Sequence, residues 1–158
     1  VVILALSTGM RQGEIKKLTW DDVDLANQRI IIQDSKNNER RAAHLASKAL
    51  ELLTELRQQK VRRIDSNLLF PGIQAFNRGP ASLRTAWLFA LKKAGIKDFR
   101  FHDLRHSAAS YLAMGGAPLL DIAAVLGHKT LSMVKRYSHL SDNHIKGVVA
   151  AMNGRIFG

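Results

Sequence analysis

The chain has 158 residues, enough for one domain with a substantial core, and its hydrophobic fraction of 46% is ordinary for a folded protein. Its charge is not ordinary: 24 lysines and arginines against 13 acidic residues give a net charge of +11, so we expect an anionic partner, with nucleic acid ahead of an anionic membrane surface and of a merely soluble basic protein. The absence of cysteine excludes disulfides and thiolate zinc sites and suits a reducing cytoplasm.

The longest apolar run, residues 1–6, lies at the very start of the chain. It is far too short to span a bilayer, and it lacks the basic leader and cleavage site of a signal peptide. We therefore expect a cytoplasmic protein with no membrane partner. Because the sequence starts in mid-pattern without an initiator methionine, we also expect it to be a fragment excised from a longer protein.

The first third of the chain predicts two short helices followed by a small sheet. Residues 1–6 resemble the end of a buried helix that closes near Gly9, and residues 12–18 predict a second helix. Alternating apolar residues predict strands at 23–25, 29–33 and 41–45, with the polar residues 34–39 as a hairpin tip. Together these strands form an antiparallel sheet.

The rest of the chain is predicted to be helical. A helix over residues 47–60 has Ser47 as its expected N-cap, and the longest irregular stretch, residues 61–80, holds two of the three prolines. Further helices are expected at residues 82–94, 103–114, 118–126, 130–137 and 142–152. The sequence therefore predicts one α+β domain over residues 1–158, mainly helical, with a small antiparallel three-stranded sheet near the N-terminus.

Five side chains form a set suited to transferring a phosphoryl group. They are Arg11, His102, Arg105, His128 and Tyr137. Guanidinium groups hold phosphate oxygens bidentately, imidazoles transfer protons, and a phenol can attack phosphorus. Arg105 falls in the first turn of its expected helix, where free amide groups and the helix dipole favour an anion, and His102 lies on the same side of that turn.

Each of these side chains also has an ordinary structural interpretation. Arg105 would then be a surface arginine beside an N-capping His102, and His128 a C-capping residue. A lone tyrosine at a helix end is usually a core residue. The spacing from His102 to His106 also suits two metal ligands on one helical face, but no carboxylate pattern supplies a third. We therefore expect no metal ion and assign His106 a supporting role.

Four short motifs follow one another in a fixed order. They are Thr8-Gly9-Met10-Arg11, His102-Asp103-Leu104-Arg105-His106, Leu126-Gly127-His128-Lys129-Thr130 and Arg136-Tyr137-Ser138-His139. Each motif alone is weak, but their order resembles the tyrosine recombinases, the integrase family of site-specific DNA recombinases. The resemblance runs from near the first residue to about residue 145. It implies an integrase-like catalytic domain, most similar to those of phage or prophage integrases.

The resemblance implies a role for each of these side chains in DNA integration and recombination. Tyr137 is the implied nucleophile, which attacks a DNA phosphate and forms a 3′-phosphotyrosyl link. Arg11 and Arg105 stabilise the transition state. His102 is the implied general base, and His128 hydrogen-bonds to the phosphate. Because the covalent intermediate keeps the bond energy, the resemblance implies no ATP, metal or other cofactor.

Two further residues complete the implied site. Lys36, at the expected hairpin tip, is the implied general acid toward the leaving 5′ oxygen, and a solvated hairpin charge is the alternative interpretation. Nearby, Ala43 and His44 replace the valine and proline that are usual in the family. Glu14 resembles the family's acidic residue after the first arginine, and we expect it to orient Arg11.

The implied partner is double-stranded DNA, on which the full-length protein acts as a homo-tetramer, and accessory DNA-bending proteins are further candidate partners. Family members carry an N-terminal core-binding domain that this chain lacks, so we expect the fragment alone to bind DNA weakly, with strong salt dependence. When bound to DNA the protein would lie with the bacterial nucleoid. Residues 143–157 are a candidate segment for exchange between neighbouring subunits.

Two other functions remain open at this point. A type IB topoisomerase shares the chemistry but relaxes supercoils without exchanging DNA partners. A DNA-binding or regulatory module would carry the same residues in an inactive site. Formation of a covalent adduct with DNA separates the active enzymes from the inactive module.

Overall fold

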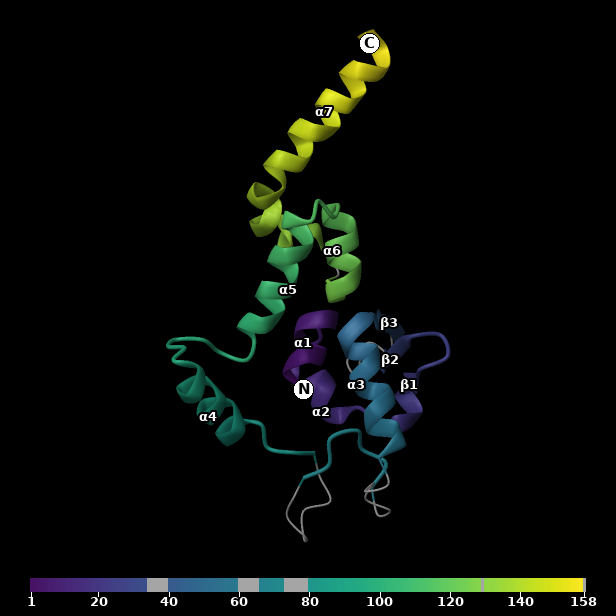
Figure 1. Ribbon diagram of the computed structural model, residues 1–158, viewed down its shortest axis with the longest axis vertical. Coiled ribbons are helices and arrows are strands. Elements are labelled where there is room, and N and C mark those ends of the chain that lie inside the picture. The colour runs from purple at the N-terminus through teal and green to yellow at the C-terminus, as the bar shows by residue number, and fades with distance from the viewer. Residues whose placement is uncertain (34–39, 60–65, 73–79, 129, 158) are drawn as a thin grey trace.

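The computed structural model describes residues 1–33, 40–59, 66–72, 80–128 and 130–157 (Figure 1). The first part of the chain forms α1 (Val2–Thr8), α2 (Gln12–Lys17), the 3₁₀ segment η1 (Trp20–Asp22), β1 (Val23–Asp24), β2 (Arg29–Gln33), β3 (Arg40–His44) and α3 (Ser47–Gln58). The second part forms α4 (Arg84–Ala94), α5 (Asp103–Met114), α6 (Leu119–Leu126), the 3₁₀ segments η2 (Leu131–Met133) and η3 (Lys135–Ser141), and α7 (Asp142–Phe157). These elements confirm a mainly helical chain with a small sheet near its start.

The sheet is antiparallel, with strand order β1-β2-β3. Ile30 and Ile32 of β2 are both buried, because alternate residues of a strand face the same side. Ile30 pairs with Ala43, and Ile32 pairs with Arg41. Since paired residues of adjacent strands share a face, Arg41 lies on the buried side of the sheet.

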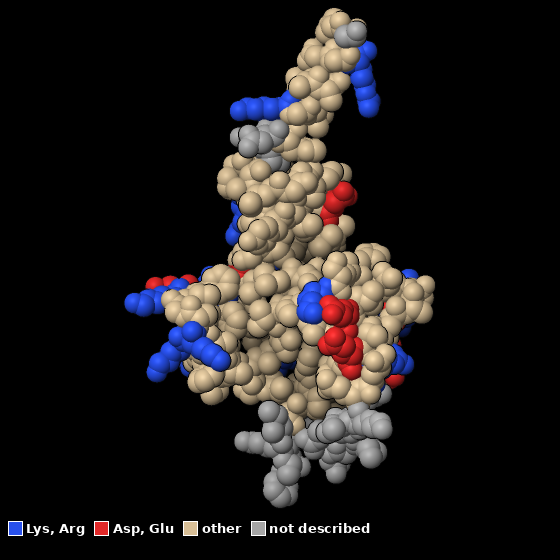
Figure 2. Space-filling view, viewed as in Figure 1, with Lys and Arg blue, Asp and Glu red and all other residues tan. Residues whose placement is uncertain are grey.

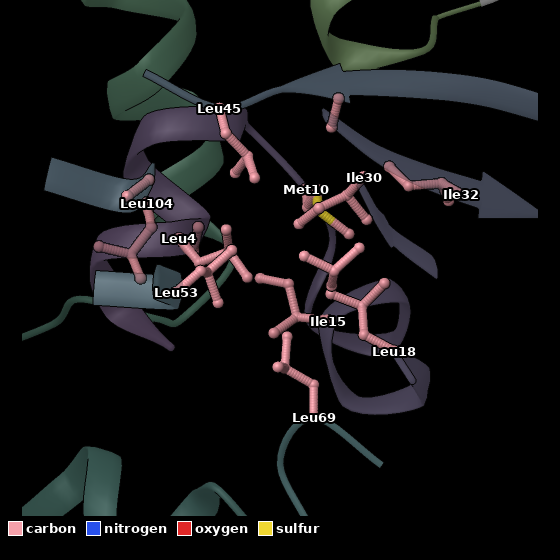
Figure 3. Packing of buried hydrophobic residues seen from close by; sticks show 14 of the residues in the cluster. Leu4, Met10, Ile15, Leu18, Ile30, Ile32, Leu45, Leu53, Leu69 and Leu104 are labelled. Carbon is pink, nitrogen blue, oxygen red and sulfur yellow. The ribbon is translucent and has the colours of Figure 1, made fainter. Parts of the chain in front are cut away.

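Among the described residues, the buried side chains form two hydrophobic clusters, and α5 belongs to both. Figure 3 shows the first cluster, where Leu4 of α1, Leu53 of α3 and Leu104 of α5 meet beside the sheet. The second cluster contains Ala109, Ala113, Ile122, Ala123, Leu126, Val134 and Tyr137. Leu104 and Ala109 are five positions apart on α5, so Arg105 lies where the two clusters meet.

Where the sequence predicts one helix over residues 130–137, the structure has two 3₁₀ segments, Leu131–Met133 and Lys135–Ser141. Val134 and Tyr137 are buried, and Leu140 is half-buried against the second cluster. A 3₁₀ helix has three residues per turn, which places side chains three apart on one face. This geometry turns all three apolar side chains toward the core.

Smaller differences concern the ends of other elements. Ala46, not Ser47, precedes the first residue of α3, and no side chain in the described ranges caps the N-terminus of this helix. Among the other helices, α4 begins at Arg84 rather than at residue 82, and α7 continues to Phe157, beyond residue 152. The expected hairpin tip, residues 34–39, and with it Lys36, lies outside the described residues.

The last helix, α7, projects away from the body of the molecule (Figure 1). Its exposed apolar side chains are Ile145, Val148, Val149, Met152, Ile156 and Phe157. Most of the surface of α7 in Figure 2 is uncharged, although basic side chains extend from it. A run of exposed apolar residues on one element is typical of a contact with another protein surface. Among the described residues, no helix is long and apolar enough to cross a membrane.

Candidate active site

Arg105 is buried at the junction of three helices, with 3% of its surface exposed. Its Nη1 donates a hydrogen bond to the carbonyl oxygen of Gly9 and its Nη2 to that of Leu126, both at 2.6 Å. These carbonyls lie at the C-terminal ends of α1 and α6, where backbone oxygens lack helical partners and the helix dipole favours a cation. The guanidinium therefore joins the ends of α1 and α6 to α5.

These two bonds determine which other side chains surround Arg105. Arg11 follows Gly9 by two residues, and His128 follows Leu126 by two. Holding the two carbonyls consequently brings Arg11 and His128 toward the same point. The electrostatics agree with this placement, because the positive charges of Arg105 and Arg11 both lower the pKa of His128.

The site concentrates positive charge. Burial, and then the charge of Arg11, lowers the pKa of Arg105 to about 10, so Arg105 stays protonated at neutral pH. Burial, followed by the charges of Arg105, Arg11 and Arg136, lowers the pKa of His128 to about 4, so His128 is neutral. Its buried Nδ1 has no hydrogen-bond partner within the described part of the chain. An unpaired buried polar atom beside two guanidinium groups suits an incoming anion such as a phosphate.

Glu14 contacts both Arg11 and Arg41. Its Oε2 accepts a bond from the backbone nitrogen of Arg11 at 2.7 Å, and its Oε1 pairs with Nη1 of Arg11 at 3.1 Å. Nη2 of Arg41 donates to Oε2 at 2.9 Å, and Nη1 of Arg41 donates to the carbonyl of Val125 at 3.1 Å. Glu14 thus contacts Arg11, the residue that we expect it to orient.

Arg41 is a residue that the sequence analysis missed. It reaches from the buried face of the sheet to α2 and to the end of α6, so it fixes the hairpin strands against the site. Its only sequence signal is the Arg40–Arg41 pair at the start of β3. That pair does not reveal the contact with Glu14, which lies 27 residues earlier.

Replacing Glu14 by glutamine should separate its charge from its capping role. Glutamine can still accept from the backbone of Arg11 but leaves two guanidinium groups without their carboxylate. We expect Glu14→Gln to lower the free energy of unfolding by about 1–2 kcal/mol, measured by urea denaturation. Glu51→Gln, which breaks an exposed pair with Lys48, is the control and should change stability little. Equal stability of the two variants would contradict the role of Glu14.

Two glycines allow the chain segments at the site to approach one another. Gly9 has a φ of 63°, and a Cβ there would lie 2.5 Å from Cδ2 of Leu126. Gly127 has a φ of 65°, and a Cβ there would lie 2.5 Å from Nε of Arg41. Both glycines therefore have left-handed backbone angles and leave no room for a Cβ atom. Any other residue would be strained at these positions.

Gly9→Ala should lower the free energy of unfolding by about 1–3 kcal/mol, because the new methyl group is strained at this φ and displaces Leu126. Gly13→Ala is the matched control. Gly13 lies inside α2, and a Cβ there meets nothing within 4 Å, so alanine should stabilise the helix by about 0.5–1 kcal/mol. Urea denaturation of both variants measures the difference. Two variants that shift in the same direction would contradict the close packing at Gly9.

Tyr137 reaches the site from η3 and is 6% exposed. Its hydroxyl lies 2.6 Å from Nδ1 of His106. The ring of His102, an exposed residue just before α5, packs edge-on against that of His106 at a centroid distance of 5.0 Å. The three side chains form a row, with His106 in the middle. The structure therefore places His106, expected to be a supporting residue, in direct contact with the expected nucleophile.

The first turn of α5 differs from the expectation of free amide groups. The backbone amides of Asp103, Leu104 and Arg105 donate to the carbonyls of the preceding turn, at 2.9, 3.3 and 3.1 Å. The side chain of Asp103 in addition accepts from the backbone of Arg100 at 2.7 Å. These amides are occupied because the chain already turns before the helix begins. An anion at this site would therefore be held by side chains.

The described residues contain no group of three histidine, cysteine, aspartate or glutamate side chains placed to hold a metal ion. His102 and His106 are neighbours, but their rings pack against each other. Lys36, the expected general acid, lies outside the described residues. The described candidate site thus contains Arg105, with Arg11 and His128 close enough to act on it or be acted on by its charge, and the row of Tyr137, His106 and His102.

A sequence model of the phage integrase family matches residues 1–144. The chain belongs to the phage integrase family. The integrase of Salmonella phage P22 is 35% identical to it over 153 residues, which cover 92% of this chain and 40% of that protein. A XerA recombinase structure superposes with a TM-score of 0.74 at 26% identity, covering 99% of this chain and 57% of that one. The catalytic domain of bacteriophage HP1 integrase superposes with a TM-score of 0.67 at 24% identity, covering 94% and 78%.

The likeness to the HP1 integrase confirms the expected integrase-like α+β fold. The match to the phage integrase family includes all four motifs, from Arg11 to Tyr137, and ends inside α7. The chain spans between 33% and 44% of the length of the first curated relatives it matches.

Proposed function

We propose that this chain is the catalytic part of a site-specific DNA recombinase, which cuts and rejoins double-stranded DNA through a 3′-phosphotyrosyl intermediate. The observation that supports this most strongly is the junction at Arg105. Its two bonds gather Arg11 and His128, and its charge also acts on Tyr137. Membership in the phage integrase family and the net charge of +11 support the same function.

In the proposed cleavage step, the oxygen of Tyr137 attacks the phosphorus while the bond to the 5′ oxygen breaks. Arg11 and Arg105 stabilise the charge on the two non-bridging oxygens. Within the described part of the chain, two of the five N–H groups of Arg105 bind carbonyls, so the others remain for phosphate. His128 is neutral and contributes a hydrogen bond rather than a charge.

Protons must move in both directions during this step. The proton of Tyr137 passes to a histidine, a role for which the sequence proposes His102. The leaving 5′ oxygen takes a proton from an acid, for which the sequence proposes Lys36. A 5′ hydroxyl of the partner strand then attacks the phosphotyrosyl bond and reverses the step. The covalent bond keeps the energy of the broken phosphodiester, so the cycle requires no ATP and no cofactor.

The proposed assembly on DNA is a homo-tetramer of the full-length protein. The exposed apolar residues of α7 support it, because a helix that projects from the body offers a surface for a neighbouring subunit. Accessory DNA-bending proteins and a location with the bacterial nucleoid belong to the same proposal.

The direct test uses the full-length protein and a nicked substrate that carries its attachment site. The nick releases the short strand after cleavage and thereby traps the covalent complex. A protein–DNA adduct that survives denaturing electrophoresis is the expected result. A protein that binds this DNA but forms no adduct would contradict the proposal and favour an inactive DNA-binding module. Relaxation of supercoils without exchange of partners would instead favour a topoisomerase.

A further inference from the structure

We propose that His106 is a catalytic residue, which holds the hydroxyl of Tyr137 and accepts its proton when the phenol attacks the phosphate. This inference rests on the proposed function, because it assigns a second residue to the same cleavage step. It departs from the sequence analysis, in which His106 was a supporting residue and His102 the general base.

The contact between the two side chains carries the inference. Oη of Tyr137 lies 2.6 Å from Nδ1 of His106, and within the described part of the chain no other group bonds this hydroxyl. Both side chains are held in place, since Tyr137 belongs to the second hydrophobic cluster and His106 lies one turn into α5. A general base must lie within hydrogen-bond reach of the proton it takes, and His106 does.

The protonation states make His106 the acceptor. Burial raises the pKa of Tyr137, although Arg136 and Arg105 oppose this, so the phenol is protonated and donates at neutral pH. Burial, and then the ring of His102, lowers the pKa of His106, so His106 is neutral and its Nδ1 can accept. The hydrogen of the neutral ring then lies on Nε2.

The groups that face His106 explain why proton transfer would accompany DNA binding. These groups are His102 just before α5, Asp103 and Arg105 of α5, Arg136 of η3 and His128 after α6. His102, Arg136 and Arg105 disfavour a positive charge on His106, whereas Asp103 favours it. A bound phosphate brings negative charge to the same place and so makes the protonated form easier to reach.

The atoms balance over the step. As the Tyr137 oxygen bonds to phosphorus, its O–H bond breaks and the proton forms an N–H bond at Nδ1 of His106. The bond from phosphorus to the 5′ oxygen breaks, and this oxygen takes a proton from the separate acid. In the rejoining step the attacking 5′ hydroxyl bonds to phosphorus and gives its proton back to the same acid, the bond from phosphorus to the Tyr137 oxygen breaks, and His106 returns its proton to that oxygen. His102 contacts the ring of His106 and is a positioning residue for it.

The first test measures the contact without DNA. In full-length protein carrying tyrosine labelled with ¹³C at Cζ, the resonance of Tyr137 is assigned by its loss in Tyr137→Phe and titrated with pH. Tyr111, which is 72% exposed, serves as the reference. We expect Tyr137 to titrate above an ordinary tyrosine, and His106→Ala to lower its midpoint, because the protonated phenol loses the group that accepts its hydrogen bond. An unchanged midpoint in His106→Ala would overturn the contact, whatever the outcome with DNA.

The second test measures the adduct rate against pH in the full-length protein. His106→Asn keeps a hydrogen-bonding group near the position of Nδ1 but cannot take a proton. We expect it to form adduct about 100-fold more slowly and to lose the fall in rate at low pH that a histidine base gives. His44→Asn, at an exposed histidine of β3, is the control and should behave as the parent does.

The two proposals fail in different ways. If the parent protein forms no adduct, the proposed function fails, while the tyrosine titration still reports on His106. If the parent forms adduct and His106→Asn matches its rate and pH profile, the assignment of His106 is overturned. The same holds if His102→Asn loses the fall at low pH while His106→Asn keeps it, since His102 would then be the base.

Discussion

Replacing Tyr137 by phenylalanine is expected to abolish the covalent adduct with DNA and leave the fold nearly intact. The substitution removes the only oxygen that the proposed mechanism uses as nucleophile. Its ring stays in the second hydrophobic cluster, where the side chain is 6% exposed. The loss of one hydrogen bond, to His106, should cost about 1 kcal/mol of stability.

The measurement is denaturing electrophoresis of the full-length protein after incubation with the nicked substrate. Tyr111→Phe is the matched control, because Tyr111 is the other tyrosine of this chain and is exposed on α5. It should form as much adduct as the parent. DNA binding by Tyr137→Phe, measured by mobility shift, should stay within a few-fold of the parent, since Arg11 and Arg105 are unchanged. An adduct that persists in Tyr137→Phe would remove Tyr137 from the mechanism.

Replacing Arg105 by lysine is expected to damage both stability and activity. An ammonium group keeps the charge, but it lacks the planar fork that binds the carbonyls of Gly9 and Leu126 together. Leaving one of these carbonyls unpaired should lower the free energy of unfolding by about 2–4 kcal/mol. The ends of α1 and α6 would then separate, and Arg11 and His128 with them. We expect the adduct rate to fall by about 100- to 1000-fold.

Urea denaturation and the rate of adduct formation test this prediction on the same protein. Arg100→Lys is the control, because Arg100 precedes the same helix, is 82% exposed and pairs with Asp103 at the surface. It should leave both quantities nearly unchanged. An Arg105→Lys protein with the parent's stability and a reduced rate would mean that Arg105 acts on phosphate alone. One with the parent's rate would contradict its place in the site.

Local signals explain why most of the fold could be predicted from the sequence. The first and last residues of the helix over residues 103–114 are predicted correctly, because an aspartate begins the helix and two glycines follow it. The strand at residues 29–33 is predicted equally well, and its three isoleucines occupy alternately buried and half-buried positions. The 3₁₀ conformation of η3 could not be predicted. Val134, Tyr137 and Leu140 follow one another at a spacing of three, which also fits one face of an α-helix.

The residues of the candidate site could likewise be predicted from the sequence only in part. The order of the motifs indicates Arg11, Arg105, His128 and Tyr137, because each carries a chemically distinctive side chain. Sequence order does not show that Arg105 is buried, since its carbonyl partners come from residues 96 and 21 positions away. Contacts of this range depend on how α1, α5 and α6 pack, and no local pattern encodes them.

His106 illustrates this limit most clearly. In the sequence it is the second histidine of a motif whose first histidine and arginine account for the resemblance. Its contact with Tyr137 joins α5 to η3 across 31 residues. Only the folded chain shows that the hydroxyl of the expected nucleophile lies against this ring.

Mapping the DNA-linked residue is the most direct test of Tyr137 as the nucleophile. Full-length protein trapped on the nicked substrate is digested with protease and nuclease, and the peptide that retains a nucleotide is sequenced by mass spectrometry. The proposed mechanism predicts a single modified residue, Tyr137, joined to the 3′ phosphate of the cut strand. A link at Tyr111, at a serine, or to a 5′ phosphate would contradict it.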